Sequence, residues 1–152
     1  QLGMIKHGSK LIQAVSNVKV PKITLNVGAS FGAGNYAMCG KAYEPDFIFS
    51  WPNAKIGVMG GEQAAKTMEQ VMISSADRKG TKIDETKLKS QLTEVTEKYN
   101  SQSDAFVTSG RGLDYGLINP TDTRKILGFL LETFWESKHR ATKPNSFGIA
   151  RM

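Results

Sequence analysis

Apolar residues recur at helical spacing in several segments of this chain. Near its start, Ile5, Ile12, Val15 and Val18 fall on one face, which predicts an amphipathic helix over residues 3–18. Apolar stripes and helix-start signals predict three further helices, over residues 60–72, from an N-cap at Asp84 to Tyr99, and over residues 119–135.

Short apolar runs between these helices have the character of strands. They cover residues 22–27, 47–51 and 55–59, with a brief fourth run at residues 117–118. The remaining segments are polar, namely a linker over residues 77–84 and a basic tail over residues 138–152 that we expect to be extended. Strands that alternate with helices predict an α/β domain.

The most unusual stretch is GASFGAGNYAMCG, residues 28–40, which follows the first predicted strand and contains four glycines and three alanines. Small residues allow another backbone or a ligand to come close to main-chain N–H groups. Three interpretations are open from the residues alone. They are a phosphate-binding loop, although neither GxGxxG nor GxxxxGK[ST] is present, a tightly packed turn, and an oxyanion hole.

Composition narrows the chemistry that the chain can perform. It has 152 residues, enough for one modest domain, with one cysteine and two histidines. No Cys/His pair has the spacing of metal ligands, so we expect no metal site, and Cys39 has no recognisable base partner for nucleophilic catalysis. The net charge of +6 favours anionic partners, which leaves a basic nucleic-acid-binding module as an alternative of a different class.

Several segments together resemble one enzyme family. The stretch at residues 28–40, WPNAKIGVMGGEQAA at residues 51–65, GRGLDYGLINPTDTRKILG at residues 110–128 and the terminal FGIARM are similar to the carboxyltransferase (β) subunit of biotin-dependent acyl-CoA carboxylases. The first two of these segments look most like 3-methylcrotonyl-CoA carboxylases, with geranyl-CoA carboxylases as close rivals.

The resemblance implies a crotonase-like fold of stacked ββα units, arranged as a superhelix. It further implies that residues 1–152 form the C-terminal lobe of a two-lobe subunit whose N-terminal lobe is absent from this sequence. In this family the acyl-CoA rests mainly on the first lobe and carboxybiotin on the second. The active site lies between lobes of different β subunits.

The same resemblance implies the function and the site. The expected reaction is carboxyl transfer from carboxybiotin to an acyl-CoA, in particular to the γ-carbon of 3-methylcrotonyl-CoA in leucine degradation. The N–H groups of Ala33 and Gly34 would stabilise the negative charge on the biotin ureido oxygen. Four neighbours are expected to bind substrate or biotin: Phe31, Gly32, Asn35 and Tyr36.

Cofactors, partners and location also follow from the resemblance. Biotin would be carried by an α subunit, which also uses ATP, and no ATP would bind here. We expect no nucleic acid or membrane partner, and location in the mitochondrial matrix of a eukaryote or in the cytoplasm of a bacterium. Another crotonase-fold enzyme, such as an enoyl-CoA hydratase, would need acid–base carboxylates, for which Glu62 is the only nearby candidate. An inactive structural partner with the same fold is a further alternative.

Overall fold

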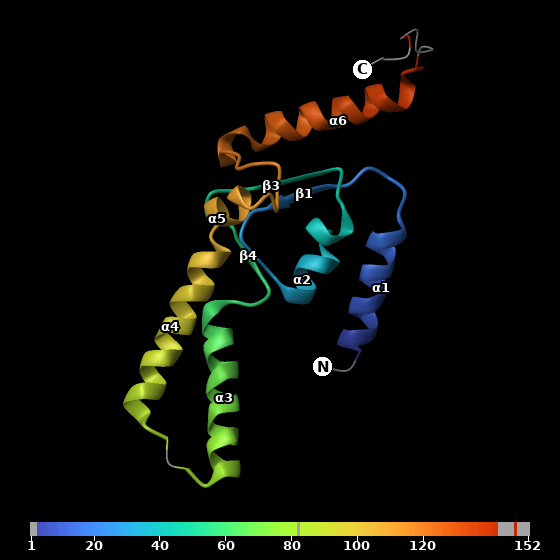
Figure 1. Cartoon of the computed structure of the whole chain (residues 1–152). Coiled ribbons are helices and arrows are strands. Elements are labelled where there is room, and N and C mark those ends of the chain that lie inside the picture. Colours follow the sequence, from blue (N-terminus) through green and yellow to red (C-terminus); the bar gives the residue numbers. More distant parts are fainter. Residues whose placement is uncertain (1–2, 82, 143–147, 149–152) are drawn as a thin grey trace. The chain divides into compact units, whose positions relative to one another are not determined.

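The computed structural model describes residues 3–81, 83–142 and 148 (Figure 1). The chain divides into two compact units, Gln1–Pro120 and Thr121–Met152. The first unit contains all the strands assigned in the described residues and most of the helices. The second contains the helix α6, Thr123–His139, which begins after a short 3₁₀ turn at Pro120–Asp122.

Two pairs of short parallel strands lie at the centre of the first unit. β1 (Ile23–Asn26) pairs with β3 (Phe47–Ser50), so that the last residues of both strands, Asn26 and Ser50, lie opposite each other. β2 (Ala29–Phe31) pairs with β4 (Lys55–Gly57) in the same parallel sense. Each pair joins strands that are not consecutive in the sequence, as expected for an α/β fold.

The two faces of β3 have different surroundings. Ile48 and Ser50 are buried on one face. On the other face the rings of Phe47 and Phe49 stack at 6.5 Å between centroids, and both lie within 6.4 Å of the Tyr115 ring. The period-two alternation of the strand therefore separates a buried polar and aliphatic face from an aromatic one.

Helices surround these strands. α1 (Met4–Asn17) precedes β1, and the short α2 (Gly32–Ala37) and a 3₁₀ turn (Lys41–Tyr43) lie between β2 and β3. α3 (Gly61–Lys79) and α4 (Glu85–Ser103) lie side by side as a hairpin, and α5 (Ala105–Gly110) follows directly (Figure 1). No helix in the described residues is long and apolar enough to cross a membrane.

Glycine and a cap define the helical hairpin. A Cβ atom on Gly61 would lie 2.6 Å from the carbonyl oxygen of Thr96, so only glycine lets α3 begin this close to α4. Gly80 ends α3 in the left-handed conformation, with φ of 63°. The Asp84 side chain accepts hydrogen bonds from the N–H groups of Thr86 and Lys87, which confirms the predicted N-cap of α4.

Several boundaries differ from those predicted. α3 continues to Lys79, so the first residues of the linker predicted at 77–84 are helical. The expected strand at residues 117–118 is only an isolated bridge between Leu117 and Ser50. α6 begins at Thr123 and ends at His139, four residues later than the prediction, and most of the expected extended tail lies outside the described residues.

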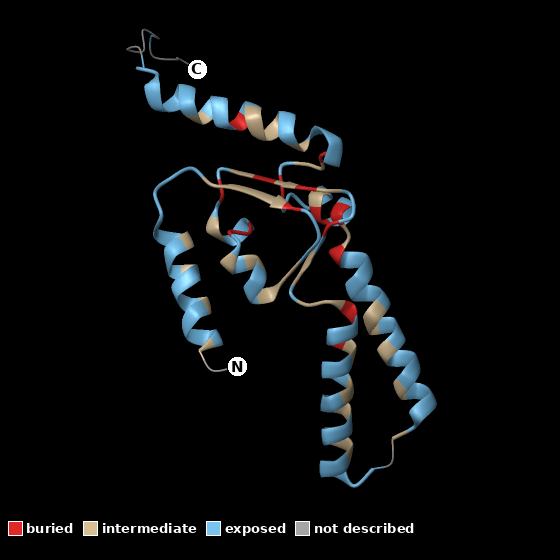
Figure 2. Ribbon diagram, turned by 180° about the vertical axis from the view of Figure 1, so that it is seen from behind, coloured by how far each residue is buried: buried red, intermediate tan, exposed pale blue. Residues whose placement is uncertain are grey.

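The buried residues of the first unit gather around its strands, whereas the outer turns of α3 and α4 are exposed (Figure 2). Small side chains dominate this core, including Cys39, Ala54, Ala64 and Ala105 together with the larger Ile48. β1 ends in the buried Asn26 and leads directly into the glycine-rich stretch.

Candidate functional site

The glycine-rich stretch forms the strand β2 and the first turns of α2, and Gly32 makes the junction between them possible. Its φ is 52°, in the left-handed region that favours glycine. A Cβ atom at this position would lie 3.0 Å from the carbonyl oxygen of Val58. The backbone itself therefore favours glycine at position 32, because both its torsion and its closeness to Val58 make a side chain costly.

Ala33 and Gly34 occupy the first turn of α2, where N–H groups have no acceptor within the helix. Both residues are exposed. In the described part of the chain, neither N–H group is paired with another backbone oxygen, and no side chain caps the helix. A Cβ atom built on Gly34 would meet nothing within 4 Å. The turn thus presents two neighbouring free donors with open space beside the second.

Asn35 holds this turn in place. Its side-chain Nδ2 donates to Ser30 Oγ at 3.0 Å, and its backbone oxygen accepts from the N–H of Gly40 at 2.7 Å. The Asn35 side chain also lies so close to Gly40 that a Cβ atom there would overlap it. Gly40 is therefore needed so that the chain can leave α2 beneath the Asn35 side chain.

A cavity of about 430 Å³ adjoins α2 on the side of β1 and β3. Of the six site residues expected from the sequence, Gly32, Asn35 and Tyr36 line it, whereas Phe31, Ala33 and Gly34 do not. The Tyr36 side chain is half-exposed and meets the Tyr43 ring edge-on at 5.9 Å. The other lining residues are Asn26, Lys41, Ala42, Ile48, Ile56, Gly57, Val58 and Leu113.

Phe31 packs away from the cavity. Cβ atoms on Gly57 and Gly60 would lie 3.5 Å and 3.7 Å from the Phe31 ring, so this ring covers the backbone at both glycines. Its role in the structure is to fill the space between β4 and the start of α3.

A buried polar cluster below the cavity was missed by the sequence reasoning. Asn26 Nδ2 donates to Ser50 Oγ at 3.1 Å, and Ser50 Oγ donates to Asp114 Oδ2 at 2.5 Å. Asp114 Oδ1 also accepts from the N–H of Gly116 at 3.0 Å. Single Asn, Ser and Asp residues in separate segments leave no local signal. The register of β1 on β3 brings Asn26 opposite Ser50, and Asp114 reaches Ser50 from a segment 64 residues further along the chain.

Comparison with known proteins identifies the family to which this chain belongs. Residues 1–147 match the family of the carboxyl transferase domain. The chain belongs to this family. It is 45% identical over 150 residues to the mitochondrial methylcrotonoyl-CoA carboxylase beta chain of Arabidopsis thaliana, covering 99% of this chain and 25% of that protein.

Two further relatives of this carboxyl transferase domain agree with the first. A probable biotin-dependent acyl-coenzyme A carboxylase beta2 subunit of Mycobacterium tuberculosis is 43% identical over 150 residues, covering 99% of this chain and 28% of that protein. The crystal structure of the beta subunit of P. aeruginosa geranyl-CoA carboxylase superposes with a TM-score of 0.85 and 48% identity, covering 99% of this chain and 28% of that one. The chain spans about a quarter of the length of these relatives. The crotonase-like α/β fold expected from the sequence is therefore confirmed.

Other candidate residues of the carboxyl transferase domain lie outside the cavity lining. Cys39 is buried, with its Sγ 4.0 Å from the Tyr43 carbonyl oxygen, and behaves as a small core residue. Glu62 is exposed in the first turn of α3 and does not line the cavity. Among the described residues, no group of His, Cys, Asp or Glu side chains could hold a metal ion.

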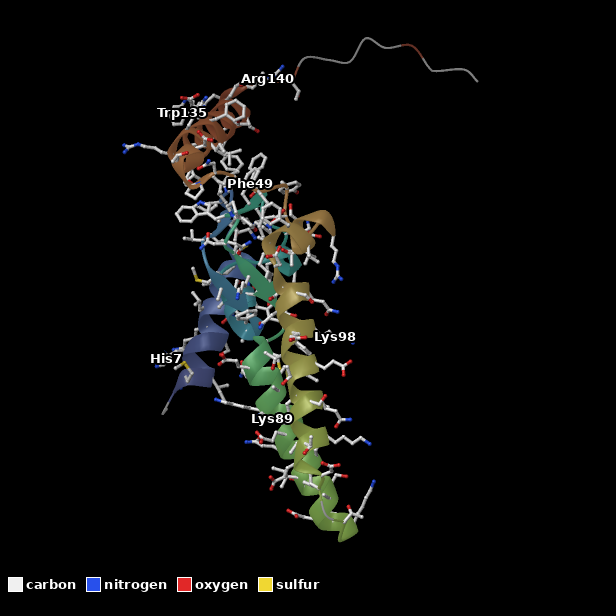
Figure 3. The ribbon with its side chains drawn as sticks, turned by 90° about the vertical axis from the view of Figure 1, so that its left-hand side faces the viewer. His7, Phe49, Lys89, Lys98, Trp135 and Arg140 are labelled. Atoms are coloured by element: carbon white, nitrogen blue, oxygen red, sulfur yellow. The ribbon has the colours of Figure 1, made fainter. Side chains whose placement is uncertain are left out.

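The positive charge of the domain is dispersed. Within the first unit, Lys41 lies on the 3₁₀ turn between β2 and β3, whereas Lys89 and Lys98 lie on α4 (Figure 3). Nucleic-acid-binding surfaces usually gather their cations into one patch or stripe. The spacing of these residues gives no support to the nucleic-acid-binding alternative.

Proposed function

We propose that this chain is the carboxybiotin-facing lobe of an acyl-CoA carboxylase β subunit, and that the complete subunit transfers a carboxyl group from carboxybiotin to an acyl-CoA. The observation that carries the proposal is a family match over residues 1–147 combined with two unpaired N–H groups at the first turn of α2. In relatives named as carboxylase beta subunits, the same segment is present over 99% of this chain.

The residues at this turn fit the biotin head group. A ureido oxygen needs donors that it can approach without meeting a side chain, and the open space at Gly34 meets that need. The neighbouring cavity of about 430 Å³ has walls of Ile48, Ile56 and Val58, which suit the apolar, sulfur-containing ring that is fused to the ureido ring of biotin. The donor turn and the apolar cavity share Gly32 and Asn35 as common walls.

Carboxybiotin, when bound, supplies the carboxyl group and a ureido oxygen that becomes more negative as that group leaves. The N–H groups of Ala33 and Gly34 would donate to this oxygen and stabilise its charge. Loss of one donor of this kind typically raises the barrier by about 2.7–4 kcal/mol. The described residues that line the cavity include no carboxylate, histidine or cysteine, and Tyr36 and Lys41 are the titratable side chains among them.

The acyl group is best described as a 3-methyl-2-enoyl thioester carboxylated at its γ-carbon. The Arabidopsis relative is named for methylcrotonoyl-CoA and the P. aeruginosa structure for geranyl-CoA, and both compounds belong to this class. The proposed substrate is 3-methylcrotonyl-CoA, as in leucine degradation, with geranyl-CoA as the alternative. A double bond conjugated to the thioester makes the γ-proton acidic in both.

Assembly follows from the same proposal. Residues 1–152 would be the C-terminal lobe, and an N-terminal lobe on another β subunit would complete the active site with acyl-CoA. A biotin-carrying α subunit would deliver the carboxyl group and use the ATP. The relatives support location in the mitochondrial matrix if the source is a eukaryote, because the Arabidopsis relative is named mitochondrial, and in the cytoplasm if it is a bacterium.

The proposal predicts that Gly34→Val in the full-length β subunit abolishes carboxyl transfer while assembly is retained. Nothing lies within 4 Å of a Cβ atom at Gly34, and its φ is outside the left-handed region, so valine fits the fold. Its branched side chain would instead occupy the volume through which the ureido oxygen reaches the N–H group. We expect a loss of at least about 100-fold in kcat, as for other lost oxyanion donors.

The assay uses the assembled holoenzyme, 3-methylcrotonyl-CoA and geranyl-CoA as separate substrates, and thermal unfolding with α-subunit co-purification as controls. Gly34→Ala is the matched variant, because a single methyl group is smaller than the valine side chain and should retain much of the activity. A Gly34→Val enzyme that assembles, melts normally and carboxylates at the wild-type rate would show that this turn is only structural.

A further inference from the structure

The buried cluster of Asn26, Ser50 and Asp114 fixes the direction of one side chain. Only 6% of Asn26, less than 1% of Ser50 and 7% of Asp114 is exposed. The Ser50 hydroxyl has one hydrogen, which is donated to Asp114 at 2.5 Å, so this hydroxyl must accept from Asn26 Nδ2 at 3.1 Å. The Asp114 carboxylate thereby fixes the direction of the Ser50 hydroxyl, and this hydroxyl fixes the orientation of the Asn26 amide.

The amide oxygen of Asn26 is left without a partner among the described residues. No fully buried side-chain oxygen or nitrogen in this part of the chain lacks a hydrogen bond, so Asn26 Oδ1 retains accessible surface. Asn26 lines the cavity, and we infer that its accessible Oδ1 faces this space. The cluster therefore holds a fixed acceptor in a wall that is otherwise mainly apolar.

We propose that Asn26 Oδ1 accepts a hydrogen bond from the uncarboxylated ureido N–H of biotin, and that Ser50 and Asp114 are positioning residues for this contact. The inference rests on the proposed function and adds a biotin-binding residue to it. Asn26 and Ser50 are the last residues of β1 and β3, and ligands of parallel sheets bind beyond the carboxyl ends of the strands.

The chemistry of the candidate ligands favours biotin. A ligand that fills the cavity removes water from this acceptor, which costs free energy unless the ligand brings a donor. The 3-methylcrotonyl and geranyl groups carry no N–H or O–H, whereas the biotin head keeps one ureido N–H when the other nitrogen carries the carboxyl group. The cavity shares Gly32 and Asn35 with α2, whose first turn carries the two free N–H groups, so a biotin ring bound in the cavity would lie next to that turn.

The test measures carboxyl transfer from the γ-carboxylated acyl-CoA to free biotin by the full-length β subunit. We expect Asn26→Leu to raise the KM for biotin about tenfold and to leave the KM for the acyl-CoA unchanged, because leucine matches asparagine in size but cannot accept. Thr24→Val is the matched control. Thr24 is two residues earlier on the same strand, donates to the Cys39 carbonyl oxygen at 2.8 Å and does not line the cavity, so neither KM should change.

The role of Ser50 is tested through Asn26. Ser50→Ala should raise the biotin KM less than Asn26→Leu does, and the double variant should equal Asn26→Leu alone, because Ser50 acts only by orienting the amide. Thermal unfolding accompanies each variant, since Ser50→Ala also removes a partner from buried Asp114.

Four outcomes would overturn the inference. Two are an unchanged biotin KM in folded Asn26→Leu and a biotin KM that also rises in Thr24→Val. The third is additive effects in the double variant. The fourth is a rise in the acyl-CoA KM of Asn26→Leu instead of the biotin KM, which would assign the acceptor to a pantetheine amide. A wild-type subunit that cannot carboxylate biotin at all would refute the proposed function itself and this inference with it.

Discussion

At the scale of single residues, the glycines of residues 28–40 are not equivalent. Gly32 is required by a φ of 52° and by the Val58 carbonyl, and Gly40 by contact with the Asn35 side chain. Gly34 has neither constraint, and a Cβ atom built on it would meet nothing within 4 Å. Absence of a side chain therefore supports the fold at two positions and leaves room for a ligand at the third.

This difference predicts that Gly32→Ala destabilises the subunit. A non-glycine residue in the left-handed region costs about 1–2 kcal/mol, and the contact with the Val58 carbonyl oxygen at 3.0 Å adds to this. Urea unfolding of the full-length subunit should show a midpoint shifted to lower denaturant.

Gly34→Ala provides the comparison for that measurement. Alanine is favoured over glycine within a helix by roughly 0.5–1 kcal/mol, so this variant should be at least as stable as the wild type. If both substitutions had the same effect on the midpoint, the left-handed torsion of Gly32 would carry no energetic weight.

The residue scale also shows where prediction from sequence ends. Ala33 and Gly34 were identified by their position in a motif, and the structure places both at the first turn of α2 with free N–H groups. Asn26, Ser50 and Asp114 were not identified, because their proximity arises from strand register and from a turn 64 residues further along the chain. A sequence motif can therefore identify residues that lie close together in the chain. Contacts between isolated polar residues far apart in the sequence produce no such motif.

At the scale of elements, strong capping signals predict helix boundaries correctly, whereas weaker polar patterns do not. Asp84 marks the start of α4 as predicted. The polar residues 77–84 predict an end of α3 that is too early. Arg78 and Lys79 in the last turn interact favourably with the helix dipole, and Gly80 provides the C-cap. β2 has only three residues and lies within a glycine-rich stretch, so its pairing with β4 decides its conformation.

The cap of α4 gives a prediction about stability. Asp84→Ala removes an acceptor for the N–H groups of Thr86 and Lys87, which should cost about 1 kcal/mol of unfolding free energy. The measurement is urea unfolding at neutral pH, with Asp84→Asn as the control that keeps the capping oxygen. Equal losses in both variants would point to the charge of Asp84, and no loss in either would mean that the cap does not contribute.

At the scale of the whole molecule, the chain spans about a quarter of its relatives and exposes many large apolar side chains. On the first unit these include Met4, Ile5, Val58 and Phe106, each at least 64% exposed. Apolar exposure of this extent is typical of surfaces that other protein segments cover. It agrees with the proposal that another lobe completes the subunit.

We therefore predict that the isolated 152-residue chain has no carboxyltransferase activity with free biotin and acyl-CoA, because the proposed acyl-CoA lobe is missing. The full-length β subunit, assayed in parallel under the same conditions, should be active. Turnover by the isolated chain at a rate comparable to that of the full-length subunit would contradict the division of the site between lobes.

The parallel pairing of β1 with β3 also governs how the chain folds. Asn26 and Ser50 are 24 residues apart in sequence, whereas α3 and α4 form a local hairpin closed by a short loop. Pairing of distant segments must first overcome the entropy of closing the chain between them, so we expect the hairpin to form early and the two strands to pair late. On the ribosome, β1 has no partner until β3 has emerged, and the buried cluster around Ser50 cannot close until Asp114 has been made.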